Sequence, residues 1–364
     1  MNSQYKQRKA LIFSFVLLII VSVGCTKQVS EDYYIVFSSN LDGKQDIYRL
    51  YANNFQSLEQ MTFTPEETEM FLVASDQGDQ ILYYVPAPDL EHIQKDSLTP
   101  PATYAHTYLL NTASKESVEL GDSLGLFPNI PLTWGENGKK FILAETGSQK
   151  LFSINVYDKT VEEFEIPRRF PGSSISGLGY SYDAQQIAYE EWHPFSGTPP
   201  DAVVHSFVYD LDTKEIIGLA NSDELSVDCK NPKWSPTKKQ ILLFCNSSEE
   251  GQGFEIRLME IQKGEAVAVH TTATFPSCFL ATWSPSGEKI AMICEDENNK
   301  KEIFLTTKEG YNHQKIFSKL PPYVAELSWS PNEDELVYIA GENTRSKYIY
   351  IIDIDGQNNR AMTT

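Results

Sequence analysis

A turn followed by a short apolar strand recurs six times along the chain, and this repeat constrains the fold more than any other sequence feature. The copies lie at 74–84, 134–143, 180–189, 234–244, 283–293 and 329–338. Their equivalent second positions are 60, 46, 54, 49 and 46 residues apart. Repeats of about 40 to 50 residues made of short strands and turns are typical of β-propeller blades. A four-stranded blade buries both faces only against other blades, so the sequence predicts a closed ring.

Every unit also contains candidates for a third and a fourth strand, marked by alternating apolar residues and by Gly, Asn and Asp at their ends. No long amphipathic helical pattern occurs, so we expect an all-β protein. The first unit begins at Tyr34–Phe37 and has no turn-and-strand copy of its own. Counting strands gives one set of three and six sets of four. We therefore predict seven blades, the first lacking one strand, and keep six blades as the alternative.

Two copies, 234–241 and 283–290, carry the motif Trp-Ser-Pro-x-x-x-x-Ile. In this motif the chain resembles the TolB-like, WD-repeat-like β-propellers of bacterial envelopes. The resemblance covers residues 34–364, which we expect to form a single propeller domain. In the TolB pattern a last inner strand at the carboxyl terminus completes the first blade, whereas this chain stops at Thr364 after a fourth strand. The resemblance implies a ring that presents loops to an envelope protein or peptide.

The amino-terminal segment has the pattern of a targeting signal. Basic residues precede the apolar run 11–23, which is shorter than the roughly 20 residues that a membrane-spanning helix needs. A glycine before Cys25 closes the run and resembles bacterial lipoprotein signals, although Ser22 stands where those signals usually have a large aliphatic residue. We expect residues 1–24 to be removed and 25–33 to be the lipidated cysteine with a short linker. An uncleaved anchor or a plain secretory peptide is the alternative.

The charge of the chain narrows its possible partners. Fifty acidic residues against 30 basic ones give a formal net charge of −20. Such a charge repels phosphate backbones and anionic lipid heads, so we expect no nucleic-acid partner and membrane attachment through the lipid anchor only. Hydrophobic residues make up 41% of the chain, which is enough to fill a core. The expected location is extracytoplasmic, at the bacterial cell membrane or the outer membrane.

Four cysteines besides Cys25 form two equally spaced pairs, Cys229 with Cys245 and Cys278 with Cys294. In each pair the first cysteine lies five residues before the Trp of the repeat, and the second lies eleven after it. In a hairpin whose turn lies between them, these positions oppose each other with Cβ atoms roughly 4.5 to 5.5 Å apart. We therefore predict two disulfides within blades, which fits an oxidising compartment. Zinc binding by the four thiols is the competing interpretation, but it would require Cys-x-x-Cys clustering that is absent.

Two insertions indicate which face of the ring could bind a partner. In a propeller the connections from second to third strand and from blade to blade emerge on one face, here called the loop-bearing face. The insertions 85–105 and 191–204 both lie between second and third strands, and loops carry function more often than strands do. The second insertion holds an aromatic and acidic cluster with the composition of a recognition surface, although a Pro-stiffened loop packed over the ring is the alternative. The first insertion is a looser, Pro-rich segment. The candidate partner-binding residues are Glu190, Glu191, Trp192, His193, Phe195, His92 and Tyr104.

Motifs of the common enzyme classes are missing. There is no Gly-x-Ser-x-Gly elbow, His-Glu-x-x-His, phosphate loop or dinucleotide fingerprint, so we assign no catalytic residue, metal site or cofactor. The alternative is a propeller enzyme such as a metal-dependent polysaccharide lyase, a class that resembles TolB-like rings and uses clustered histidines with basic residues. The six histidines are scattered, and none of the seven arginines lies in either insertion. We therefore favour a monomeric scaffold that binds a protein or peptide.

Overall fold

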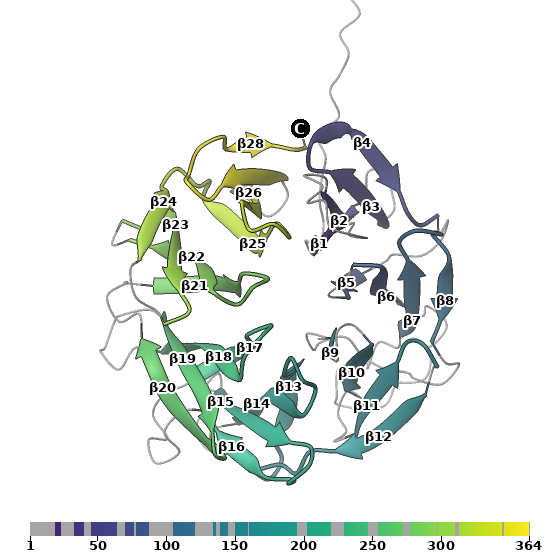
Figure 1. Cartoon of the computed structure of the whole chain (residues 1–364), viewed down its shortest axis with the longest axis vertical. Helices are drawn as coiled ribbons and strands as arrows, with labels where there is room; N and C mark the ends of the chain where they lie inside the picture. Colours follow the sequence, from purple (N-terminus) through teal and green to yellow (C-terminus); the bar gives the residue numbers. More distant parts are fainter. Residues whose placement is uncertain are drawn as a thin grey trace, which may run out of the picture.

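The strands of the chain form seven separate sheets. The computed structural model describes residues 19–22, 33–39, 45–63, 70–75, 78–86, 105–120, 134–135, 139–144, 150–158, 160–194, 202–219, 229–246, 254–271, 277–296, 298–309, 313–343 and 346–363. They form seven four-stranded antiparallel sheets, arranged as blades around a central axis (Figure 1). None of these residues is helical, and no membrane-spanning helix is found among them. The all-β, seven-bladed prediction is confirmed, and the six-bladed alternative is wrong.

In each blade four consecutive strands follow one another from the axis outward. The first three blades are β1 (Ile19–Ser22), β2 (Tyr33–Ser39), β3 (Asp46–Tyr51) and β4 (Asn54–Gln60); β5 (Met70–Ala74), β6 (Gln80–Pro86), β7 (Ala105–Asn111) and β8 (Ser117–Glu119); and β9 (Trp134–Gly135), β10 (Lys140–Ala144), β11 (Lys150–Asn155) and β12 (Val161–Glu165). The fourth and fifth are β13 (Ser174–Tyr180), β14 (Gln186–Pro194), β15 (Ala202–Asp210) and β16 (Ile216–Gly218); and β17 (Cys229–Trp234), β18 (Gln240–Asn246), β19 (Phe254–Gln262) and β20 (Glu265–Thr271). The last two are β21 (Ser277–Trp283), β22 (Lys289–Glu295), β23 (Lys301–Thr307) and β24 (Gln314–Phe317); and β25 (Tyr323–Trp329), β26 (Glu335–Asn343), β27 (Ser346–Asp353) and β28 (Arg360–Ala361).

The first blade has four strands, so the expectation that it lacks one is wrong for the full chain. Its innermost strand, β1, comes from the segment interpreted as a signal and pairs antiparallel with β2. The inner edge of β2 otherwise offers unpaired backbone N–H and C=O groups, and an extended segment satisfies them. β1 does not belong to the sequence repeat, because this strand carries no Trp-Ser-Pro turn. Removal of residues 1–24 stays a prediction, and Cys25 lies outside the described residues.

The repeated serine closes the turn between the first and second strands. In five of the described turns its backbone N–H donates to the carbonyl oxygen five positions later, as from Ser284 to Lys289 at 2.8 Å. The Ser284 hydroxyl in turn accepts a hydrogen bond from the Lys289 N–H at 3.2 Å. The residue three positions after the serine has a positive φ in four turns, at Gly78, Ala184, Gly287 and Glu333. This shared geometry explains why the copies are similar in sequence.

Blade seven closes the ring against blade one by side-chain packing. Tyr33 and Ile35 of β2 are buried against residues of β26 and β27, among them Val337 and Ile351. The Tyr33 hydroxyl also donates to Glu335 Oε2 at 2.7 Å. Burial and this carboxylate raise the pKa of Tyr33 above its usual value. Because each blade contains only its own consecutive strands, closure depends on these interblade contacts.

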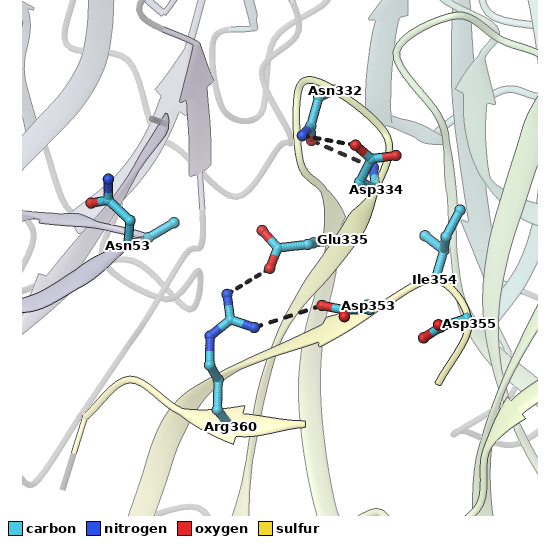
Figure 2. A pocket seen from close by; sticks show the side chains of 9 residues that line it. Asn53, Asn332, Asp334, Glu335, Asp353, Ile354, Asp355 and Arg360 are labelled. Atoms are coloured by element: carbon cyan, nitrogen blue, oxygen red, sulfur yellow. Dashed lines mark hydrogen bonds and ion pairs between the residues drawn. The ribbon is translucent and has the colours of Figure 1, made fainter. Parts of the chain in front are cut away.

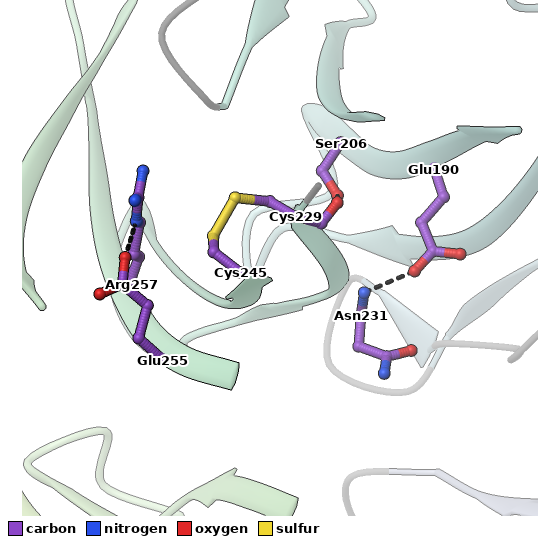
Figure 3. The surroundings of a disulfide bond; sticks show 7 residues. All are labelled: Glu190, Ser206, Cys229, Asn231, Cys245, Glu255 and Arg257. Carbon is purple, nitrogen blue, oxygen red and sulfur yellow. Dashed lines mark hydrogen bonds and ion pairs between the residues drawn. A yellow bond between two sulfur atoms is a disulfide. The ribbon is translucent and has the colours of Figure 1, made fainter. Parts of the chain in front are cut away.

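Both expected disulfides are present. Cys229 opposes Cys245 across β17 and β18, and Cys278 opposes Cys294 across β21 and β22, each with a Cα separation of 4.0 Å. Figure 3 shows the first bridge near Ser206, whose hydroxyl donates to the Cys229 carbonyl oxygen at 2.8 Å. All four cysteines are buried. The zinc interpretation is therefore wrong, and the bridges cross-link the two inner strands of blades five and six.

Candidate partner-binding site

The second insertion is a strand over its first residues and not a loop. β14 continues to Pro194 and pairs with β15 over nine residue pairs. Successive side chains of a strand point to opposite sides, so Glu190 and Glu191 make different contacts. Because second strands run from the tight turns toward the loop-bearing face, Trp192 lies near that face.

Glu191 holds the connection between blades three and four. Its side chain is fully buried, and Oε1 accepts hydrogen bonds from the Phe170 N–H at 2.7 Å and from the Ser173 hydroxyl. Oε2 accepts another from the Arg169 N–H at 3.1 Å. A buried carboxylate is costly unless such donors surround it. Glu191 therefore has an internal role, which fixes the segment 167–173 on the loop-bearing face.

Glu190 joins blade four to blade five. Its carboxylate accepts a hydrogen bond from the backbone N–H of Asn231 in β17, as Figure 3 shows. Asn231 lies in a β-bulge and has a φ of 54°, which turns this N–H away from the regular ladder. Glu190 Oε2 accepts two further bonds, from the Ser176 hydroxyl at 2.9 Å and from the Trp192 indole N–H at 3.0 Å. With 5% of its surface exposed, Glu190 is also an internal residue.

Gly177 leaves room for this carboxylate. It lies in the bulge of β13 with a φ of +60°, where a Cβ atom would stand 2.8 Å from the side-chain carbons of Glu190. Both the backbone conformation and the space therefore favour glycine at this position. The bulge at Gly177 makes room for the Glu190 carboxylate, and this carboxylate binds the Trp192 indole. The two features together therefore set the position of Trp192.

Trp192 combines exposure with a fixed orientation. The residue is 38% exposed, although its indole N–H is bonded to the buried Glu190. Among the candidate residues whose side chains the structure describes, Glu190 and Glu191 are buried and Trp192 is exposed. The side chain of His193 and the whole of Phe195, His92 and Tyr104 lie outside the described residues.

The segment 167–173 lies beside the candidate residues on the loop-bearing face, although it was not among the residues expected from the sequence. Neither insertion contains an arginine. The exposed Arg169 nevertheless lies beside the second insertion, because its backbone N–H donates to Glu191, the first residue of that insertion. The available signal was Arg168-Arg169-Phe170 in a connection between blades, which the topology places on the loop-bearing face. A positive side chain in an acidic protein and an exposed tryptophan thus belong to the same face.

A second unexpected feature is a charged group formed by residues of two innermost strands, β17 and β25, and of the third strand of blade seven, β27. Lys233 of β17 and Glu326 of β25 interact electrostatically, and Lys347 of β27 also interacts with Glu326. Glu326 is partly buried, and this desolvation raises its pKa to about 7 against the opposing effect of the two lysines. Lys233 is an exposed residue, yet the protein around its ammonium lowers its pKa by desolvation, an effect that Glu326 opposes. The Lys233 ammonium donates to the Ala281 carbonyl oxygen at 3.0 Å, which ties blade five to blade six.

An acidic pocket lies on the opposite face, where blade seven meets blade one (Figure 2). It has a volume of about 500 Å³ and is lined by tight turns of the two blades. Arg360 forms ion pairs with Glu335 and Asp353 in its wall, and Asp334 accepts a hydrogen bond from Asn332. The charged groups of the pocket are therefore paired with one another. We interpret the pocket as a part of the contact between blade seven and blade one.

Within the described part of the chain, no three His, Cys, Asp or Glu side chains form a group that could hold a metal ion. His106 is paired with Glu119 at 2.6 Å. His205 stacks on Phe170 with ring centroids 5.1 Å apart.

No protein-family model matches the chain, and no curated protein matches its sequence. Solved structures do match its fold. An oligogalacturonate lyase in complex with manganese has 10% sequence identity and a TM-score of 0.63, over 95% of this chain and 98% of the lyase. The β-propeller domain of the Trilobed protease from Pyrococcus furiosus has 12% identity and a TM-score of 0.60, over 96% of this chain and 98% of that domain.

TolB from Acinetobacter baumannii is also among the matches. It has 14% identity and a TM-score of 0.47, over 92% of this chain and 77% of TolB. The seven sheets of the chain define a seven-bladed β-propeller, and the lyase and the Trilobed protease domain match this fold over nearly their whole length. At such identities the similarity defines the fold and leaves the activity to the side chains of this protein.

Proposed function

We propose that this chain is an extracytoplasmic β-propeller that binds an envelope protein or peptide through its loop-bearing face, with Trp192 at the centre of the contact. The observation that carries the proposal is that Trp192 is 38% exposed while its indole is bonded to Glu190. A side chain that is already oriented loses little conformational entropy when a partner binds. Tryptophan is also enriched among the residues that dominate binding energy.

The proposed location outside the cytosol is supported by the two buried disulfides, because such bonds persist in oxidising compartments. In this proposal a lipid on Cys25 attaches the monomeric ring to the membrane. The similarity to the manganese-bound lyase concerns the fold, so we do not extend that activity to this chain.

Affinity capture from membranes with the Trp192→Ala variant tests the proposal. If Trp192 is a hot spot, the variant should lose about 2 kcal/mol of binding free energy, or roughly thirtyfold in affinity. Tyr182→Ala is the matched control, because Tyr182 is 42% exposed in the same blade but lies in a tight turn on the opposite face. An equal loss of partner in the two variants, or no loss in either, would contradict the proposed site.

A further inference from the structure

The inner position of the first blade is occupied by a segment that is expected to be removed. β1 lies within residues 1–24 and pairs with β2 from Ile19 opposite Val36 to Ser22 opposite Tyr33. In the six other blades the corresponding strand comes from the same repeat as its neighbours. A chain that begins at Cys25 would therefore lack the inner strand of one blade.

β2 has the contacts to remain in place without β1. One set of its side chains, Tyr33, Ile35 and Phe37, packs against blade seven. The alternate set, Tyr34 and Val36, packs against blade two. On its outer side β2 pairs with β3 over six residue pairs. The loss of β1 would thus leave an ordered strand whose inner backbone groups lack strand partners.

We propose that, in the processed protein, the inner edge of β2 is an acceptor site for an extended segment of the protein partner. This inference rests on the extracytoplasmic processing included in the proposed function. Addition of a strand to an open sheet edge is a recurrent mode of peptide recognition, in which backbone hydrogen bonds provide affinity. Here β1 itself shows that the edge accepts an antiparallel strand.

The geometry also defines the chemistry of the occupant. β1 supplies four paired residues with the sequence Ile-Ile-Val-Ser, and β-branched aliphatic residues favour the extended conformation. β1 lies on the axial side of β2 (Figure 1), so an incoming segment must reach the interior of the ring. The expected occupant is therefore a flexible, uncharged and aliphatic segment of at least four residues without proline.

The first measurement is the mass of the amino-terminal peptide of the protein purified from membranes. The second is fluorescence anisotropy of that protein with a labelled peptide of residues 17–24, made soluble by added lysines. Two N-methylated peptides are compared with it, one methylated at Ile19 and Val21 and the other at Ile20 and Ser22. In an antiparallel pair only alternate residues direct their N–H groups at the partner strand. One methylated peptide should therefore bind at least tenfold more weakly, and the other within about twofold of the parent.

Three results would overturn the inference: a purified chain that still contains residues 19–22, a processed chain that does not bind the parent peptide, or equal effects of the two methylation patterns. The Trp192→Ala capture experiment fails or succeeds independently of these results. If that variant loses the partner while methylation has no alternating effect, only the strand-acceptor inference is lost.

Discussion

The indole N–H of Trp283 donates a hydrogen bond to the backbone carbonyl oxygen of Lys233, one blade earlier in the chain, at 3.1 Å. Two other repeats make the same contact, from Trp234 to Gly179 at 3.0 Å and from Trp329 to Thr282 at 3.2 Å. In each case the acceptor directly precedes the position equivalent to the tryptophan. The tryptophan of the motif therefore links successive blades, and its recurrence follows from the repeated geometry of the ring.

The Trp283→Phe variant should be less stable by about 1 to 2 kcal/mol. It loses the indole donor and part of the buried surface, and it leaves the Lys233 carbonyl oxygen without this partner. Urea unfolding measures the change. Tyr182→Phe, at an exposed aromatic residue, should change the free energy of unfolding by less than about 0.5 kcal/mol. Equal losses in the two variants would argue against an interblade role for the motif tryptophan.

Each disulfide should stabilise the ring by a similar amount. The two bridges have the same sequence separation of 16 residues and the same place in successive blades. In the chain-entropy model a loop of this size contributes about 3 kcal/mol. The double variants Cys229→Ala with Cys245→Ala and Cys278→Ala with Cys294→Ala should each lose about that much in urea unfolding. A loss below about 1 kcal/mol in both would contradict the expectation.

Ala184 and Gly287 occupy equivalent turn positions, and exchanging alanine and glycine there should change the free energy of unfolding in opposite directions. Ala184 has a φ of 53°, where a side chain is disfavoured, so Ala184→Gly should stabilise by roughly 0.5 kcal/mol after the entropy cost of glycine. Gly287 has a φ of +70°, and an added Cβ would stand 2.5 Å from Thr237 Oγ1. Gly287→Ala should therefore destabilise by about 2 kcal/mol. Thermal unfolding of both variants tests the signs, and a shift in the same direction would show that the turns are not equivalent.

Glu326 should make stability decrease as the pH rises. Its folded pKa of about 7 lies above the ordinary value of 4.5, so between these values the folded state binds more protons than the unfolded state. The stabilisation is complete below pH 4.5 and is lost as the pH rises through 7. Glu326→Gln should thus match the parent near pH 4.5 and exceed it at about pH 8 by on the order of 2 kcal/mol. Urea unfolding across this range measures the gap, with exposed Glu162→Gln as the control.

The fold could be predicted because its main signals are local. The Trp-Ser-Pro turns mark the boundary between first and second strands, and the spacing of Cys229 and Cys245 reports their register. β1 could not be found in this way, because it lacks the turn motif and its pairing with β2 depends on the open edge of that strand. An isolated extended segment has no repeat by which a sequence comparison can detect it.

The candidate site was predictable only in part. Trp192 could be placed on the loop-bearing face from strand order alone. The internal roles of Glu190 and Glu191 could not be, because their donors come from other connections and blades. The N–H of Asn231, for instance, is 41 residues from Glu190 and becomes available through a bulge with positive φ. Acidic residues beside an exposed aromatic residue resemble a recognition surface in sequence, whereas in the structure they orient it.

This orienting role predicts that Gly177→Ala weakens partner binding while Trp192 itself is retained. The added Cβ would stand 2.8 Å from the Glu190 side chain, so the carboxylate must move and its hydrogen bond to the Trp192 indole is disturbed. Gly264→Ala is the matched control, because Gly264 also has a positive φ, of +83°, but lies in the tight turn between β19 and β20 on the opposite face. The nearest atom to a Cβ added there is Glu215 Oε2, at 3.9 Å. Both variants share the backbone strain, and only Gly177→Ala displaces Glu190. Partner affinity should fall at least about tenfold in Gly177→Ala and stay within about twofold in Gly264→Ala. Equal affinities would mean that Trp192 binds without the orientation that Glu190 provides.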